Sequence, residues 1–355
     1  MKKILIIGAG FTGATIARTL AEAGYSVEIV DKRDHVAGNA YDYKCSGNGL
    51  RMHKYGPHIF HTNNEKVYKF INRFCELDNY RHKVKAEFNG EYFTLPPNKD
   101  LKKRFTTDEI LDIFFKPYTK KMWNISWDKL SSSVKNRLKF RDDDSDEYFT
   151  DKYQGMPKEG YTKLVENMLN HENITLFLNS NIKNDCMGKH RIMWEYDHVF
   201  SAMPIDEFYN NRFSALEWRS VKFREVHYAE APVEGVFVIN NTTVLGATRT
   251  AYYTELSSNN SWWDKFIRGD RITWRASAIA EYPCDADMNN GERYYPVKDP
   301  DGYNTERYKK YVEYAKGDEN VTHVGRCGKY TYIDMDQAIN QGLQTAIKYI
   351  EKDKE

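Results

Sequence analysis

The sequence predicts a protein of the mixed α/β (α+β) class, in which a parallel βαβ unit is combined with an antiparallel-sheet domain and a reduced helical domain. The N-terminal run Lys3–Ile7 is apolar and β-branched, and it leads through a glycine turn into a helical pattern. Strand signals dominate the stretch Phe223–Glu281, which indicates a separate antiparallel sheet. A long amphipathic helix is predicted at Asp334–Glu351.

The N-terminal elements follow the order of a dinucleotide-binding unit. After Lys3–Ile7 and the turn Gly8–Gly13 come a helix at Ala14–Ala23 and a second strand at Tyr25–Val30, which ends at Asp31. The glycines allow the tight turn, the approach of a pyrophosphate and close packing of helix and strand. The acidic side chain at the strand end would accept hydrogen bonds from an adenosine ribose. We therefore predict a Rossmann-like domain; FAD is favoured, and this unit alone leaves NAD open.

Composition excludes several classes of protein. The 52 Lys and Arg residues balance 51 Asp and Glu residues, so no global field would attract nucleic acid or an anionic membrane. The five cysteines are scattered without a Cys-x-x-Cys pair, which indicates neither a disulfide framework nor a zinc site. No stretch approaches the roughly 20 apolar residues of a membrane span. These features favour a cytoplasmic protein without a metal.

Three further segments carry chemistry-bearing side chains. The stretch Met52–Thr62 contains three histidines, which either hydrogen-bond backbone in a loop or serve a site; a zinc site is the weaker reading. The stretch Phe114–Trp123 is aromatic and basic, and its simplest interpretation is an amphipathic connector with core aromatics. The acidic run Arg141–Glu147 predicts a solvated, mobile loop.

The remaining pattern predicts alternating helices and strands. These are the helices Glu65–Leu77, Thr107–Phe115 and Gly160–Asn170, the hairpin Lys83–Thr94, the strands Ile174–Leu178, His198–Ser201, Val236–Asn240, Ala251–Glu255, Ile272–Ala280 and Val321–Gly325, and a loop at Arg326–Tyr332.

Several separated motifs, taken in order and with their spacing, resemble the UDP-galactopyranose mutase family over nearly the whole chain. The motifs are Gly8–Gly13, Gly38–Ala40, Lys54–Thr62, Tyr118–Trp123, Tyr153–Pro157, Gly160–Thr162, Tyr294–Val297, Gly325-Arg326, Tyr330, Tyr332 and Asp334-Met335. The resemblance implies FAD-binding parts at 1–80, 176–220 and 316–355, a helical cap with a substrate loop at 81–175, and an antiparallel-sheet substrate domain at 221–315.

The resemblance also implies an activity. Such an enzyme interconverts UDP-galactopyranose and UDP-galactofuranose without net redox change, through a sugar adduct on N5 of reduced FAD, and needs a reductant such as NAD(P)H or reduced flavin. An amine oxidase-like FAD oxidoreductase and a catalytically silent binding protein are the alternatives from other classes. The same chemistry on another UDP-sugar, such as UDP-N-acetylgalactosamine, is also left open.

Site residues carried over from the family fall into three groups. The catalytic group is Arg141, Arg249, His58 and His61. The substrate-binding group is Phe114, Tyr118, Trp123, Tyr153, Tyr295 and Tyr332. The cofactor-binding group is Gly8, Gly10, Phe11, Thr12, Gly13, Asp31, Lys32, Gly38, Asn39, His58, Arg326, Asp334 and Met335.

The arginines are expected to stabilise the diphosphate leaving group, since paired guanidinium donors match its geometry. Because the carboxylates of 142–147 repel one another, the Arg141 loop is expected to be open without ligand and to close on the diphosphate.

The chain departs from the family in two places. Only a short segment separates Pro96 from Phe114, where members usually carry a helical bundle, so the dimeric state is left open. Pro117 replaces the usual glycine before Tyr118.

Overall fold

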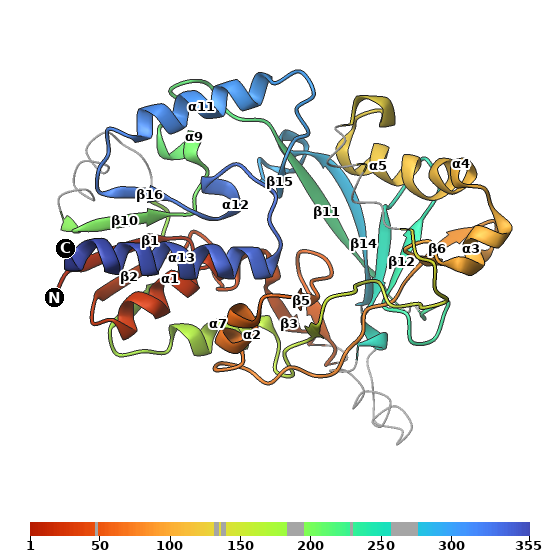
Figure 1. Cartoon of the computed structure of the whole chain (residues 1–355), viewed down its shortest axis with the longest axis horizontal. Coiled ribbons are helices and arrows are strands. Elements are labelled where there is room, and N and C mark those ends of the chain that lie inside the picture. The colour runs from red at the N-terminus through yellow and green to blue at the C-terminus, as the bar shows by residue number, and fades with distance from the viewer. Residues whose placement is uncertain (47–48, 131–134, 136–139, 183–194, 228–229, 257–275) are drawn as a thin grey trace.

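The computed structural model describes residues 1–46, 49–130, 135, 140–182, 195–227, 230–256 and 276–355. Figure 1 shows a parallel sheet flanked by helices in one half of the molecule and a larger twisted sheet with short helices in the other. The predicted mixed α/β class with a Rossmann-like unit is therefore confirmed.

The parallel sheet has the strand order β16-β10-β1-β2-β9. Its strands are β1 (Lys3–Ile7), β2 (Ser26–Val30), β9 (Ile174–Phe177), β10 (His198–Ser201) and β16 (Val321–His323). Helices α1 (Phe11–Glu22) and α13 (Met335–Lys354) cover one face of it (Figure 1). They pack so closely that a Cβ on Gly342 would lie 2.7 Å from the Cβ of Thr15.

The second sheet is mixed rather than purely antiparallel. Its order is β15 (Tyr295–Pro296), β11 (Trp218–His227), β14 (Ala276–Asp285), β13 (Arg249–Tyr252), β12 (Val238–Asn241), β6 (Val84–Phe88) and β7 (Glu91–Leu95). Every neighbouring pair is antiparallel except β12 and β6, which run parallel. The hairpin β6–β7, which precedes the other strands by more than a hundred residues, supplies this edge. Residues 272–275 of the predicted strand Ile272–Ala280 lie outside the described residues.

The helical region is one almost continuous rod. A capping box of Thr106 and Glu109 begins α4 (Thr107–Ile110), a π-helical turn follows at Leu111–Phe115, and α5 (Lys116–Trp123) completes the rod. Pro117 has no backbone N–H and cannot continue the helical hydrogen-bond pattern, which accounts for the wider π-helical turn at Leu111–Phe115. The predicted helix Thr107–Phe115 thus extends to Trp123.

The other elements complete the connections. They are β3 (Asp42–Lys44), β4 (Arg51–His53), β5 (Phe60–Thr62), β8 (Tyr153–Gly155), α2 (Glu65–Ile71), α3 (Lys99–Arg104), α7 (Tyr161–Leu169), α9 (Ile205–Phe208), α11 (Tyr303–Ala315), α12 (Gly325–Gly328), and short 3₁₀ turns at Gly38–Ala40, Trp127–Lys129, Tyr253–Glu255 and Ala286–Asn289. Three predictions were wrong in detail: α2 ends before Leu77, α12 occupies part of the predicted loop Arg326–Tyr332, and the predicted strand Ala251–Glu255 ends at Tyr252, where a 3₁₀ turn begins.

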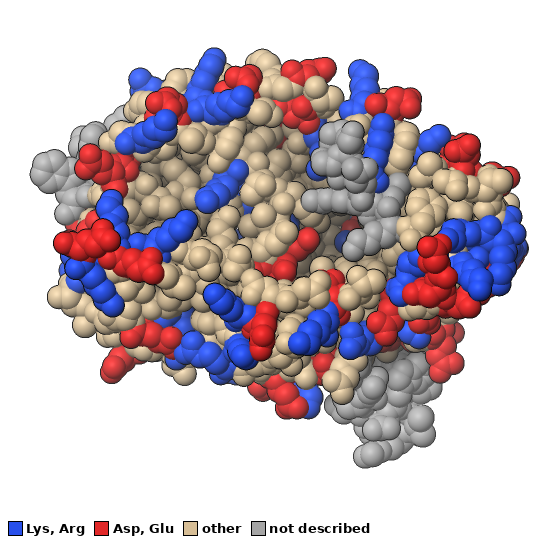
Figure 2. Space-filling model, viewed as in Figure 1, with Lys and Arg blue, Asp and Glu red and all other residues tan. Residues whose placement is uncertain are grey.

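The surface shows no single dominant sign of charge. Acidic and basic side chains are mixed over the face in Figure 2, as the net charge of +1 implies. Among the described residues, no helix combines the length and apolar character that crossing a membrane requires.

Candidate active site

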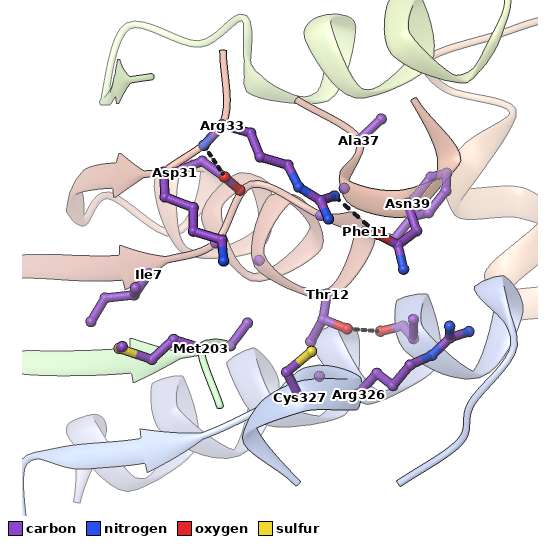
Figure 3. Close-up of a pocket in the computed structure, with 18 of the residues that line it drawn as sticks. Ile7, Phe11, Thr12, Asp31, Arg33, Ala37, Asn39, Met203, Arg326 and Cys327 are labelled. Carbon is purple, nitrogen blue, oxygen red and sulfur yellow. Dashed lines mark hydrogen bonds between the residues drawn. The ribbon is translucent and has the colours of Figure 1, made fainter. Parts of the chain in front are cut away.

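A large cavity opens where four strands of the parallel sheet end. Gly8, Asp31, Ala202 and Gly325 follow β1, β2, β10 and β16, and all four line the cavity, whose volume including its mouth is about 1360 Å³ (Figure 3). Ligands of open α/β sheets bind at this edge. The lining includes every residue expected to contact the cofactor: Gly8, Gly10, Phe11, Thr12, Gly13, Asp31, Lys32, Gly38, Asn39, His58, Arg326, Asp334 and Met335.

The glycine turn leaves room for a pyrophosphate. A Cβ on Gly13 would collide with the carbonyl oxygen of Gly8, so this glycine is needed for helix and strand to pack. A Cβ on Gly10 would meet no atom closer than 3.8 Å, the Cα of Gly38, and would fill space beside the cavity. The residues present therefore fit a dinucleotide whose phosphates approach the backbone at Gly10.

Asp31 organises the turn through two backbone hydrogen bonds. One carboxylate oxygen accepts the N–H of Ala9 at 2.8 Å, and the other accepts the N–H of Arg33 at 2.9 Å. Each oxygen can accept a further hydrogen bond, so the ribose interaction expected of Asp31 is sterically and chemically open.

The far wall of the cavity comes from α13 and α12. Asp334 caps α13 in a reciprocal capping box with Gln337, which directs the N-terminal end of a 20-residue helix at the cavity. The partial positive charge of this end favours an anionic ring. Arg326 donates to the carbonyl oxygens of Tyr294 at 3.2 Å and Ile333 at 2.7 Å. These bonds connect the residue before β15 to the segment that leads into α13.

His58 links the cofactor cavity to the second sheet. Its backbone N–H donates to Nδ1 of His53, and its own Nδ1 bonds the Gly56 carbonyl at 2.8 Å. Burial lowers the pKa of His58 to about 3, and the nearby His53, Arg326 and Arg249 act in the same direction. A neutral ring whose Nδ1–H donates to the Gly56 carbonyl presents Nε2 as a hydrogen-bond acceptor.

His61 lies on the next strand, β5, and faces a different partner. Its Nδ1 is 3.1 Å from an oxygen of Asp151, and its ring stacks on Phe149 with the centroids 3.7 Å apart. A second histidine that sequence reasoning missed, His82, also stacks on Phe149. Burial, and then the charge of Arg249, lower the pKa of His82 to about 3.

Arg249 is held by a buried carboxylate. Its Nε donates to Oε2 of Glu281 at 2.8 Å, and Glu281 is only 4% exposed. Burial acts to lower the pKa of Arg249, but the Glu281 carboxylate, together with Tyr118 and Tyr294, outweighs it and raises that pKa well above its ordinary value. The second oxygen of Glu281 has no hydrogen-bond partner among the described residues and occupies the space where Gly56 lacks a side chain. Arg249 is therefore a permanent, oriented cation.

The expected aromatic residues divide between the site and the core. Trp123 packs edge-on against Tyr295 at 4.8 Å and Tyr332 at 6.2 Å between ring centroids. Tyr118 lies within the field of Arg249, and burial raises the pKa of its phenol above the ordinary value. These rings form a half-open aromatic cluster beside Arg249.

Two expected contacts are corrected. Phe114 is 2% exposed and packs edge-to-face against Phe88, Phe93 and Phe105, so its ring belongs to the core. Tyr295 is completely buried, and its hydroxyl donates to the carbonyl of Met122 at 2.9 Å instead of facing a phosphate.

Tyr153 has a third arrangement. Its ring stacks on that of Tyr68, with the centroids 3.9 Å and the planes 11° apart. Strand β8, which carries Tyr153, pairs with β5 and its His61.

Arg141 is turned toward its own loop. Its Nε and Nη2 each lie 2.9 Å from an oxygen of Asp143, and its Nη1 donates to the carbonyl of Glu147 at 2.6 Å. The acidic run is also paired from outside, since Asp142 and Asp146 form ion pairs with Lys102 and Lys83. Residues 142–144 are exposed, as expected of a solvated run, but two neighbouring lysines offset part of the repulsion among its carboxylates. Within the described part of the chain, the side-chain contacts of Arg141 are to its own loop, and those of Arg249 are to Glu281.

Sequence reasoning missed residues that reach the cavity from the second sheet. Arg33 bonds Asn39 at 3.0 Å and pairs with Glu292 at 2.7 Å, and Glu292 and Arg293 both line the cavity. Arg33 could have been found because it follows Asp31 directly. Nothing local in the sequence signals Glu292, which lies 259 positions away in the chain.

The βαβ unit and its cavity define a protein that binds a dinucleotide cofactor, and its second sheet carries an aromatic cluster and an arginine held by a buried carboxylate. A model of the NAD(P)-binding Rossmann-like domain matches residues 6–74, and a model of the UDP-galactopyranose mutase family matches residues 113–332. A probable UDP-galactopyranose mutase of Klebsiella pneumoniae is 33% identical, covering 98% of this chain and 95% of the relative. The chain thus belongs to the UDP-galactopyranose mutase family of flavin-dependent isomerases.

Two further comparisons bear on substrate and fold. A dTDP-fucopyranose mutase of Escherichia coli is 31% identical over the full length of both chains. The crystal structure of a reduced UDP-galactopyranose mutase superimposes with a TM-score of 0.72 at 16% identity, covering 100% of this chain and 95% of that one. At this low identity, the superposition shows that the two proteins share a fold.

Proposed function

We propose that the protein interconverts the pyranose and furanose forms of UDP-galactose, with bound FAD in its reduced state. The observation that carries this proposal is a chain of contacts: His58 lines the cofactor cavity and bonds the Gly56 carbonyl, Gly56 lies against Glu281, and Glu281 holds Arg249. A flavin in the cavity and a diphosphate on Arg249 would therefore be neighbours. Reduced FAD supplies a nucleophilic N5 for the anomeric carbon, with no net redox change.

The chain's own residues would supply placement and charge. Arg249, fixed by Glu281, would stabilise the negative charge that develops on the departing diphosphate more than the charge of the bound substrate. Tyr118, Trp123 and Tyr332 would enclose the nucleotide sugar. His58 would hold a neutral acceptor at the cavity wall, and the N-terminal end of α13 would favour the reduced ring.

Arg141 would act as the second guanidinium only after a rearrangement. Its donors now serve Asp143 and Glu147, so a diphosphate would have to replace these contacts. Because Asp143 is 58% exposed, its carboxylate can be rehydrated when released. Closure of the 141–147 loop is then an exchange of partners driven by the ligand.

A second substrate is favoured by one observation. The dTDP-fucopyranose mutase of Escherichia coli is nearly as similar as the Klebsiella relative, 31% against 33% identical. A dTDP-linked 6-deoxyhexose is therefore the second candidate. The putrescine oxidase among the structural neighbours is 11% identical and shares the fold alone, so it does not favour the oxidase alternative.

The test is a direct product analysis. Purified protein loaded with FAD is reduced with dithionite or NAD(P)H, incubated with UDP-galactose or dTDP-fucose in parallel, and the products are separated by chromatography. A furanose product from the reduced sample, absent from an oxidised aliquot, is expected with UDP-galactose. Turnover of dTDP-fucose alone would move the assignment to the second candidate, and no product from either would refute the mutase proposal.

A further inference from the structure

Helix α5 presents Tyr118 and Trp123 to the site, yet it has little rigidity of its own. It is eight residues long, it follows a π-helical turn, and it stops at Asn124, whose backbone is left-handed with φ of 55°. The last carbonyl groups of a helix have no partner within the helix. The position of Trp123 therefore depends on what holds this helix end.

Arg219 on β11 binds the backbone carbonyl groups at the C-terminal end of α5. Its Nη2 donates to the carbonyl oxygen of Lys121 at 3.0 Å, and its Nε donates to that of Met122 at 3.1 Å. Its Nη1 pairs with Asp285 on the neighbouring strand. Arg219 is 4% exposed, so this fork operates away from water. A cation at a helix C-terminus also opposes the negative end of the helix dipole.

Two other side chains fasten the same turn. The hydroxyl of Tyr295 donates to the Met122 carbonyl at 2.9 Å, and the Tyr295 ring packs against Trp123. Nζ of Lys121 donates to the carbonyls of Asn241 and Ala247, at 3.0 and 2.8 Å. These two carbonyls flank the turn that leads into Arg249 on β13. The helix end is thus tied to the strand that carries the site's arginine.

We propose that Arg219 is a positioning residue of the nucleotide-sugar site, which orients Trp123 and Tyr118 by binding the carbonyls of Lys121 and Met122. The inference deepens the proposed function and rests on it. The planar guanidinium binds the two carbonyls through two different nitrogens in a fixed geometry, which the single nitrogen at the end of a lysine side chain does not reproduce. Asp285 is 48% exposed on its side chain and contributes less, because the two carbonyls hold the fork without it.

The proposal makes different predictions for four variants. Arg219→Lys should raise the KM for the sugar nucleotide, and the Kd for UDP measured by calorimetry, by about tenfold, with kcat changed less than about twofold and FAD content unchanged. Asp285→Asn should keep both constants within about twofold of the wild type. Arg224→Lys is the matched control, since Arg224 lies exposed on the same strand and has no contact with α5 among the described residues. Tyr295→Phe removes the second donor to Met122, keeps the ring, and should raise the UDP Kd about threefold.

The outcomes are distinguishable. If Arg219→Lys and Tyr295→Phe both bind UDP as tightly as the wild type, the positioning role is refuted, whatever their thermal stability. If Arg219→Lys fails to fold, an unchanged UDP Kd in Tyr295→Phe refutes the role and a raised one supports it. If the wild-type protein binds neither UDP nor dTDP, the proposed function fails and the inference falls with it.

Discussion

Alanine at Gly13 and alanine at Gly10 should damage the protein in different ways. A Cβ on Gly13 would lie 1.9 Å from the carbonyl oxygen of Gly8 and 3.2 Å from Cγ2 of Ile6, so strand β1 and helix α1 must separate by about 1 Å. Both contacts belong to the centre of the parallel sheet. A Cβ on Gly10 meets only Gly38, at 3.8 Å, and the Gly10 backbone is extended with φ of −78°.

The expected magnitudes differ accordingly. Separating a packed strand and helix costs about 3 kcal/mol, the upper end of overpacking, which lowers the Tm of a chain of this size by about 4 °C. Gly13→Ala should show this loss without cofactor. Gly10→Ala should fold with a Tm within about 2 °C of the wild type, but its methyl group occupies the approach of the pyrophosphate, so the FAD affinity should fall about tenfold or more.

The assay is thermal unfolding of the apoprotein, followed by FAD titration with flavin fluorescence. FAD should raise the Tm of the wild type and have a smaller effect on Gly10→Ala, because a ligand stabilises only the state that it binds. Wild-type stability in Gly13→Ala, or wild-type FAD affinity in Gly10→Ala, would refute the assignment of these two glycines.

Three further predictions concern charge. Arg141→Ala should reduce turnover at least about tenfold and leave FAD content unchanged; retained turnover would remove Arg141 from the site. Glu281→Ala should lower the free energy of unfolding by about 3 kcal/mol, because it leaves the Arg249 guanidinium without its carboxylate partner. Glu281→Gln keeps a hydrogen-bond acceptor for Arg249, so urea denaturation should show a smaller loss of stability. The pKa of both His58 and His82 is about 3 in the folded protein, below about 6.5 for an unfolded chain, so their stabilising contribution is complete above pH 6.5 and is lost as the pH falls toward 3. Each should cost about 2 kcal/mol of stability at pH 5 relative to pH 7, and His82→Gln should flatten this dependence in urea denaturation.

Local sequence patterns predicted the βαβ unit well because the residues that determine it lie close together in the sequence. The glycine spacing, the helical periodicity and the strand ending at Asp31 lie within 31 residues, and each fixes the conformation of its own segment. The resemblance extended this to the cavity residues on α12 and α13. The placement of Arg326 and Asp334 beside the glycine turn depends on packing across the whole sheet, which no local pattern contains.

The wrong expectations share a physical cause. Phe114 and Tyr295 are aromatic residues in a motif, and an aromatic side chain suits a core as well as a cleft. The acidic run at 141–147 was judged by its own charges, whereas Lys83 and Lys102 come from other parts of the chain. The parallel pairing of β12 with β6 joins strands whose sequence separation hides their contact.

The hairpin β6–β7 has a consequence for engineering. It is encoded between two stretches of the parallel-sheet half, yet it forms the edge of the other sheet. Conversely, Glu292 comes from the segment between strands of that second sheet, yet it lines the cofactor cavity of the parallel-sheet half. The two halves are therefore interleaved in the gene and cannot be swapped as cassettes between homologues at a single crossover. A chimaera with altered nucleotide preference would need several coordinated junctions, or point changes within one parental scaffold.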